Sequence, residues 1–238
     1  MKPLRIALLF GLGLAALLAG CSAPSSELFP LREGTEWHYR VLTQPEVGEP
    51  DEETLVLRAM GQETLADGST AWHRRSDAGM DWWLRSDDTG IYRVASKSDS
   101  DPEPSPDPAR RYVLKLPHKV GTEWRATTAA YLLQRPQQFP RELRSTHQDI
   151  PMVYVIEHLD ESVTTPAGAF QHCLRVAGKA QLRLYLDPVT GWADVPLTTT
   201  EWYCPGPGLV KVVREESGHN TFLIGGTYLM ELTQWHPS

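Results

Sequence analysis

From residue 36 onward, the chain is a succession of short segments in which apolar and polar residues alternate. Trp37, Tyr39 and Val41 alternate with polar or charged neighbours, and a similar alternation returns at 182–187. Alternation with a period of two is typical of strands that bury one face. No segment after residue 20 carries a long apolar repeat of 3.6 residues. The sequence therefore predicts an all-β or β-dominated domain with at least ten strands.

Turn residues separate these segments at short intervals. Asp67-Gly68 precedes a segment at 70–75, and the sequence DDTG at 87–90 separates segments at 82–85 and 91–94. Asp and Gly between alternating segments are typical of β-hairpins. We therefore expect an antiparallel meander that forms a curved sheet, a sandwich or an open barrel, and the sequence does not distinguish these three.

One stretch has a different composition. Residues 96–110 contain four prolines and several acidic residues, and they lack large apolar side chains, which predicts a disordered, acidic, Pro-rich loop. Its acids begin with the spacing of a calcium-binding loop. However, Pro104 stands where such a loop needs glycine, and Arg110 stands where it needs its last glutamate. No metal site is predicted.

The N-terminus has the features of a secretion signal. Lys2 and Arg5 precede an apolar run at 6–18, which is too short for a comfortable membrane span, and small residues follow at 19 and 20. We expect residues 1–20 to be a cleaved signal, 21–28 a tether, and 29–238 a single β-rich domain.

The end of this signal, Leu18-Ala19-Gly20-Cys21, resembles the lipobox of bacterial lipoproteins. The resemblance implies that Cys21 carries a covalent lipid, and two or three acyl chains hold a protein firmly on a membrane. Ser22, rather than Asp, after the cysteine implies the outer membrane more than the inner one. The alternative is an ordinary cleaved signal that a cysteine follows by chance.

Charge and cysteine count narrow the class further. The chain has 23 basic and 30 acidic residues; without 1–20, which hold two basic residues and no acid, the charge is −9. This acidic balance argues against a nucleic-acid partner. Beyond Cys21, only Cys173 and Cys204 remain, and two thiols in an oxidising compartment suggest one disulfide. The alternatives are two separate buried thiols or, with less support, a metal site.

Three sequence blocks resemble a broad group of uncharacterised bacterial lipoproteins. They are FPL with Gly34 and Trp37 at 29–39, TPAGAF with Cys173 at 165–173, and WYCPGPGLVK at 202–211. The group usually has Val at the position of Pro207. The resemblance covers about 29–214 and implies a β-rich secreted domain. It implies no reaction, cofactor or catalytic residue.

Catalytic motifs do not stand out. The chain has neither GxSxG nor HExxH, and its eight histidines are scattered. We therefore predict no catalytic residues and no cofactor. The tryptophans suggest binding more than chemistry: Trp82 and Trp83 are neighbours on one expected strand, so their rings should point to opposite faces. The candidate binding aromatics are Trp72, Trp82, Trp83, Trp192 and Trp235. The alternative is that these aromatics fill a large β core.

These observations predict a non-enzymatic envelope lipoprotein, anchored through its lipid, with a structural or protein-interaction role and an envelope protein as partner. An exposed aromatic patch would favour this hypothesis. A second hypothesis is a lipid or lipoprotein carrier, which an apolar cavity of several hundred Å³ would favour. A third is a hydrolase whose site is assembled in space, which a cleft with a nucleophile and a base would favour.

Overall fold

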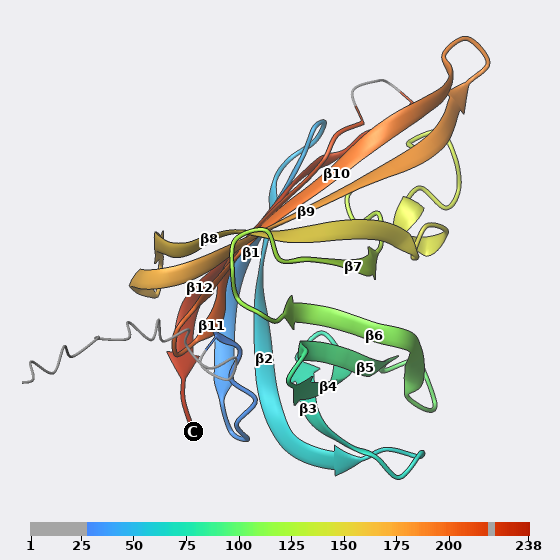
Figure 1. Cartoon of the computed structure of the whole chain (residues 1–238). Helices are drawn as coiled ribbons and strands as arrows, with labels where there is room; N and C mark the ends of the chain where they lie inside the picture. Colours follow the sequence, from blue (N-terminus) through green and yellow to red (C-terminus); the bar gives the residue numbers. More distant parts are fainter. Residues whose placement is uncertain (1–27, 219–221) are drawn as a thin grey trace, which may run out of the picture.

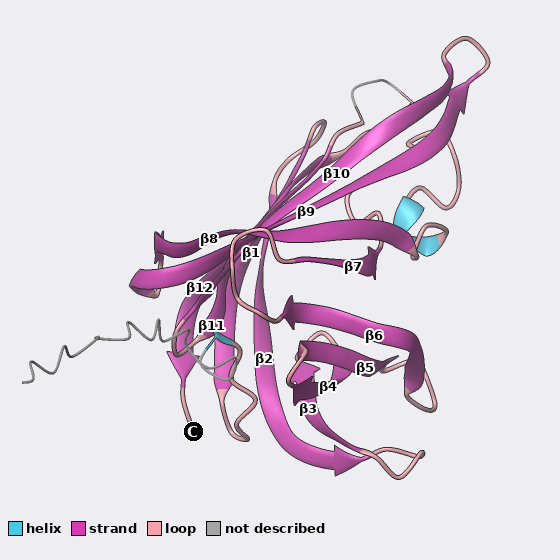
Figure 2. Cartoon of the chain, viewed as in Figure 1, coloured by secondary structure: helices cyan, strands magenta, loops and turns pink. Residues whose placement is uncertain are grey.

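The computed structural model describes residues 28–218 and 222–238, and it consists almost entirely of strands (Figure 1; Figure 2). The strands form a single antiparallel sheet, with one short 3-10 turn at Leu143–Ser145. The strands are β1 Glu36–Pro45, β2 Asp51–Thr64, β3 Thr70–Ser76, β4 Met80–Asp87, β5 Gly90–Ser98, β6 Ser105–Lys115, β7 Glu123–Thr128, β8 Ile150–Thr165, β9 Gly168–Asp187, β10 Gly191–Cys204, β11 Gly208–Glu216 and β12 Gly226–His236. The predicted fold class is confirmed.

The order of the strands is that of an interrupted ring. Every strand pairs with its neighbours in sequence except at the step from β6 to β7, and the first and last strands, β1 and β12, also pair with each other. The two edges of the sheet are therefore β6 and β7, which are consecutive in the chain. The single sheet curls until its two edges approach each other. Of the three predicted arrangements, the structure is therefore the open barrel, and this barrel is nearly closed.

The connection between the two edge strands spans the remaining gap. Lys115 at the end of β6 donates from Nζ to the carbonyl oxygen of Glu123 on β7, at 3.3 Å. Within the connection, the backbone N–H of Gly121 donates to the carbonyl oxygen of Ile156 on β8, and the N–H of Ile156 donates to Thr122. These bonds hold the two edges near each other without a β-ladder between them.

The inner face of the barrel carries the core, as the alternation predicts. Trp37, Tyr39 and Val41 on β1 are each at most 1% exposed, and they pack against Leu232 on β12. Burial of apolar area contributes about 25 cal/mol per Å², so rows of large side chains on the inner face are the main stabilising term.

The segment that precedes β1 closes one end of the barrel. Leu28 and Phe29 are both 5% exposed and belong to a core cluster with Ile91, Leu114 and Trp124 from three strands. Gly208 allows this fit because a Cβ there would lie 2.9 Å from the ring of Pro30, and its φ of +81° favours glycine. We call this end, where the described chain begins, the base.

The structure differs from the prediction at 96–110. Residues 96–98 end β5, and β6 begins at Ser105, so only 99–104 form a turn. Arg93 on β5 holds the opposite strand through two hydrogen bonds to Asp107, at 2.6 and 2.7 Å. The prolines are accommodated because β6 is an edge strand, where one side needs no backbone donors.

Within residues 28–218 and 222–238, no helix has the length and apolarity that crossing a membrane requires. The predicted signal and Cys21 lie outside the described residues.

Candidate functional site: the central cavity

A cavity of about 310 Å³ lies inside the barrel, which we call the central cavity. Binding pockets for small molecules typically measure about 300–1,000 Å³, so its size suits a small ligand. Strands from both halves of the sheet contribute to its wall. The apolar part of the wall includes Leu57, Trp82, Leu84, Val113, Leu209 and Val212. Phe29 lines the cavity at the base.

The most unusual residue in this wall is Arg74, on β3. Only 8% of the residue is exposed, and its guanidinium lies over the rings of Phe29 and Trp37, at 4.2 and 4.3 Å. Its Nη2 donates to the carbonyl oxygen of Pro30 at 2.8 Å, whereas its Nε has no hydrogen-bond partner. Burial lowers the pKa of Arg74 to about 10. The wall therefore contains a cation that the described residues solvate incompletely.

A carboxylic acid lies elsewhere in the same wall. Glu201 and Tyr203 are two residues apart on β10, so both point inward, and the Tyr203 hydroxyl donates to Oε2 of Glu201 at 2.5 Å. Burial raises the pKa of the Glu201 carboxyl, against the smaller effects of the Tyr203 hydrogen bond and the charge of Arg214. Burial likewise raises the pKa of Tyr203. The acid therefore favours its neutral form more than an exposed glutamate does.

Two further arginines reach the central cavity from the edge side of the sheet. Arg93 is occupied by its two bonds to Asp107. Arg111 on β6 pairs with Arg93 through the strand backbone, and its side chain makes no hydrogen bond or ion pair within the described residues. Burial, and then the charge of Arg93, lower the pKa of Arg111. Arg111 is thus the second incompletely paired cation in this wall.

A second chamber of about 550 Å³, which we call the upper cavity, continues from the first toward the end opposite the base. The two share Arg111, Tyr154, Glu201 and Val212 in their walls, which makes them neighbouring compartments of one interior.

A buried ion pair borders the upper cavity. Nε of Arg214 donates to Oε1 of Glu216 at 2.6 Å, and the other guanidinium nitrogens donate to Thr128 and Ala129. The Glu216 carboxylate also accepts backbone N–H groups from the segment 131–133, at 2.9–3.2 Å. Every charged group here has partners, so this pair fixes the loop that follows β7.

The five candidate tryptophans are not brought together. Trp82 lines the central cavity, whereas Trp83 points to the opposite face, as predicted. Trp83 stacks on His73 with ring centroids 4.9 Å apart, and its Nε1 donates to Glu63 at 2.9 Å. Its own neighbours thus cover it, and it is 5% exposed.

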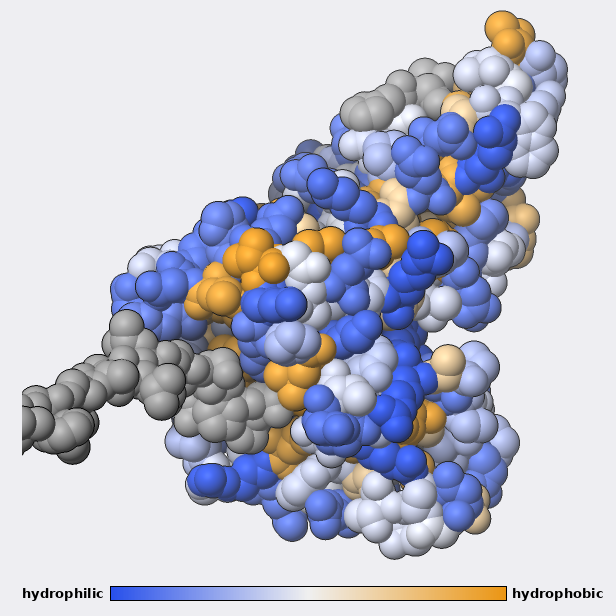
Figure 3. Space-filling view, in the orientation of Figure 1, coloured by the Kyte–Doolittle hydropathy of each residue, from blue (hydrophilic) through white to orange (hydrophobic). Residues whose placement is uncertain are grey.

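The remaining three lie at the two ends of the barrel. Trp72 and Trp235 line a pocket of about 580 Å³ at the base, beside Leu31. Trp192 lies near the tip of the long β9–β10 hairpin, where it is 62% exposed and contacts Tyr185 edge-on. Figure 3 shows apolar side chains at this extremity of the molecule.

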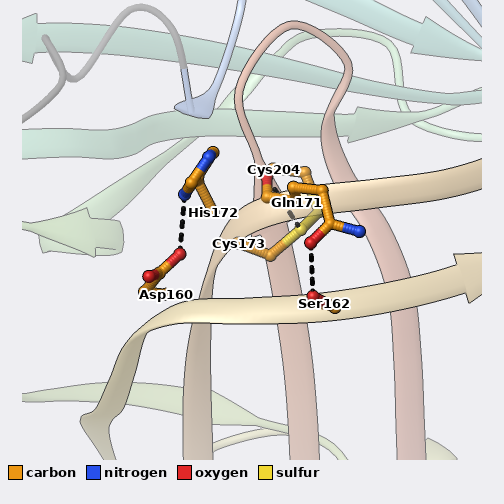
Figure 4. Close-up of a disulfide and its surroundings, with 6 residues drawn as sticks. All are labelled: Asp160, Ser162, Gln171, His172, Cys173 and Cys204. Carbon is orange, nitrogen blue, oxygen red and sulfur yellow. Dashed lines mark hydrogen bonds and ion pairs between the residues drawn. A yellow bond between two sulfur atoms is a disulfide. The ribbon is translucent and has the colours of Figure 1, made fainter.

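The two cysteines of the domain form a disulfide. Cys173 on β9 and Cys204 on β10 are fully buried and joined, as Figure 4 shows. The bond therefore ties the strand that follows the Pro-Ala-Gly turn to the strand that precedes the Pro-Gly-Pro-Gly turn. Neither cysteine lines the central cavity.

Histidine–carboxylate pairs are present, but without an attached nucleophile. His73 contacts Glu63 at 2.7 Å and Asp81 at 2.6 Å, and the exposed His172 contacts Asp160 at 2.7 Å (Figure 4). Across the described residues, no serine or cysteine hydrogen-bonds to a histidine. The Thr146 hydroxyl contacts Nδ1 of His147 at 2.9 Å, but no acidic side chain pairs with that histidine within the same residues. No group of three or more His, Cys, Asp and Glu in this part of the chain could hold a metal ion. The geometry gives no support to the hydrolase hypothesis.

Sequence reasoning missed the polar residues of the cavity wall. Arg74 and Arg75 look like a surface pair, but adjacent strand residues face opposite sides. Arg75 points outward to Asp81 and Asp99, so Arg74 points inward. The same period of two places Glu201 beside Tyr203. The alternation of side-chain direction is visible in the sequence. It identifies these residues as part of a cavity wall only when the closure of the sheet is known.

Comparison with known proteins gives a fold-level likeness alone. No protein-family model matches the chain, and no curated protein matches it. A structure from Parabacteroides distasonis, described provisionally as a lipoprotein, is 16% identical with a TM-score of 0.42, over 88% of this chain and 98% of that one. A provisionally assigned exported protein of Bacteroides fragilis with a YmcC-like fold is 14% identical with a TM-score of 0.35, over 88% and 99%. TM-scores this low carry no argument about function.

Proposed function

We propose that the protein is a non-enzymatic envelope lipoprotein, held on the outer membrane by lipid on Cys21, whose barrel binds a small amphipathic molecule. The observation that carries the binding role is the central cavity. It adjoins the upper cavity on one side, through shared wall residues, and is bounded by Phe29 on the other. This observation favours the carrier hypothesis over a purely structural role.

The lipobox-like sequence at 18–21 supports the anchor. Cys21 lies seven residues before Leu28, so an anchor there would place the base next to the membrane and the upper cavity away from it. A ligand would then enter from the side that faces away from the anchoring membrane.

Fractionation tests the anchor. We expect the wild-type protein in the membrane fraction with the mass of an acylated N-terminal cysteine, and the Cys21→Ala protein to lack the lipid and leave that fraction. Equal partitioning of the two proteins would refute the lipid anchor.

A neutral fluorescent probe tests the cavity. N-phenyl-1-naphthylamine should bind the Cys21→Ala protein with enhanced emission. A second substitution, Ala126→Trp, places a large side chain in the central cavity and should abolish probe binding. The control substitution, Ala78→Trp in an exposed turn, should leave probe binding intact. Probe binding that survives Ala126→Trp in a folded protein would refute the proposal.

The β9–β10 tip supports a second candidate function, binding to another envelope protein. Val189 is 96% exposed and Trp192 62%, and exposed aromatic side chains are typical of interface anchors. A photo-crosslinker at position 189 should capture one defined protein. The same crosslinker at Val120, which is exposed near the base, should not capture it.

A further inference from the structure

Arg74 is a buried cation without a charged partner. No acidic side chain pairs with it among the described residues, and its Nε lacks a hydrogen bond. The titratable groups that act on it are Tyr39 and Tyr203. Both phenols are neutral at neutral pH, because burial raises the pKa of each above its ordinary value. Nothing in its surroundings neutralises the Arg74 charge.

Such an arrangement is unfavourable in a folded protein that binds nothing. A buried charge costs free energy unless a counter-charge and hydrogen bonds compensate it. Aromatic rings offset part of this cost, since Phe29 and Trp37 both present their faces to the guanidinium. The rings supply no hydrogen-bond acceptor for Nε.

Arg111 adds a second positive charge to the same cavity. It stands where the central and upper cavities meet, and it too lacks an acidic partner. The nearest acid on its side, Asp107, is engaged by Arg93. Glu201 is the acid in the wall of the central cavity, and its carboxyl is held by Tyr203. The wall thus offers two unpaired cations against one acid.

The rest of the wall is apolar. Leu57, Trp82, Leu84 and Leu209 surround the same space as Arg74. A ligand that matches this wall carries one negative group and an apolar body. Guanidinium groups bind carboxylates and phosphates through paired hydrogen bonds. Within the described residues, the Arg74 guanidinium donates only from Nη2, to Pro30, so it retains donor capacity for such a group.

We propose that the central cavity binds an amphipathic organic anion, with its negative head on Arg74, Arg111 as a second cation, and its apolar chain along the hydrophobic wall. This deepens the proposed function and depends on it. Two sources carry this chemistry, a free fatty acid and a single-chain phospholipid with an anionic headgroup.

The test compares ligands that share an apolar chain and differ in the charge of the head group. Laurate and dodecanol share their chain length, and each would be titrated against the Cys21→Ala protein by displacement of the neutral probe. Charge-assisted hydrogen bonds lead us to expect laurate to bind about tenfold to a hundredfold more tightly. Lauroyl-lysophosphatidylglycerol forms the third arm. Binding tighter than that of laurate would identify the phospholipid, and weaker binding the fatty acid.

Variants locate the head group. Adding Arg74→Met should remove most of the preference for laurate and leave dodecanol affinity within about threefold of its original value. Arg111→Met should weaken laurate binding less, and Arg125→Met, an exposed arginine on β7, should leave it unchanged. Arg74→Lys should retain part of the preference, which a merely structural arginine would not explain.

Two results would overturn this inference. One is equal affinity of the Arg74-containing protein for laurate and dodecanol, a comparison that needs no cavity variant and stands even if Arg74→Met does not fold. The other is a folded Arg74→Met protein that prefers laurate as strongly as the parent protein does. If neither these ligands nor the neutral probe binds at all, the proposed function itself fails.

Discussion

Two buried arginines on the inner face of the barrel differ in almost every respect except burial. Arg214 is 7% exposed and Arg74 is 8% exposed. Arg214 bonds to Glu216, Thr128 and Ala129, so each of its nitrogens has a partner. Arg74 has one backbone acceptor and two aromatic rings. The two arginines are therefore buried to the same extent but differ in how fully their charge is paired and hydrogen-bonded.

This difference separates a structural charge from one that a ligand can complete. Removing one member of a complete buried pair leaves the other charge without compensation, which is strongly destabilising. Replacing a charge that has no counter-charge with an apolar side chain of similar size removes an unfavourable burial instead. The two positions should therefore respond to the same substitution with different magnitudes.

The largest effect should come from Arg214→Met. The substitution leaves the Glu216 carboxylate buried without its cation, and we expect the free energy of unfolding to fall by about 3–5 kcal/mol. Urea denaturation followed by tryptophan fluorescence measures this. Arg125→Met, on an exposed surface, should change it by less than about 0.5 kcal/mol. A loss under 1 kcal/mol at position 214 would contradict a structural role for the Arg214–Glu216 pair.

The disulfide should stabilise the protein by an amount similar to that expected for the Arg214–Glu216 pair. Cross-linking Cys173 and Cys204, 31 residues apart, should contribute about 3–4 kcal/mol on the chain-entropy account. Cys173→Ser with Cys204→Ser should show this loss under oxidising conditions, and a reductant should then have no further effect. A reductant that destabilises the double variant as much as the wild type would contradict this assignment.

Arg74→Met should have a much smaller effect on the ligand-free protein. The lost ring contacts and the bond to Pro30 are offset by the relief of an unpaired buried charge, so we expect a change within about 1 kcal/mol. The same urea denaturation, on protein stripped of lipid by organic extraction, measures it. A loss as large as that of Arg214→Met would mean that Arg74 is primarily structural.

The smallest effect should depend on pH and come from Glu201. Its pKa is raised in the folded protein, so its stabilising contribution is complete below the unfolded value of about 4.5 and is lost as the pH rises through the folded pKa. Glu201→Gln should therefore gain stability relative to the wild type as the pH rises from 4 to 8. Thermal unfolding across this range measures the gain, which the exposed control Glu123→Gln should not show.

Local features of the fold were accessible from the sequence. Alternation located the strands, Asp-Gly pairs located turns, and the opposite faces of Trp82 and Trp83 followed from the period of two. The pairing of β1 with β12 was not accessible, because no local pattern joins residues so far apart. Without knowledge of that closure, an inward face cannot be recognised as a cavity wall. Arg74 and Arg75 then look like two neighbouring surface arginines.

The same limitation explains the difference at 96–110. Composition described a solvated loop, but one long-range ion pair, Arg93 with Asp107, aligns the proline-rich segment as an edge strand. Proline content argues against a central strand and not against an edge, and the sequence does not reveal which strands form the edges.

The pairing of β1 with β12 also has a consequence for the order of folding. On the proposed export route, the N-terminus crosses the membrane first, which delivers β1 first and β12 last, so β1 would lack one of its two neighbours until translocation is nearly complete. Pairings between distant segments form late because long loops must close first. The half-sheet from β1 to β6 would meanwhile present β1 as an unpaired edge, which favours aggregation. On that route, fast delivery of the whole chain, or a chaperone that shields β1, would increase the fraction of the protein that reaches its folded state.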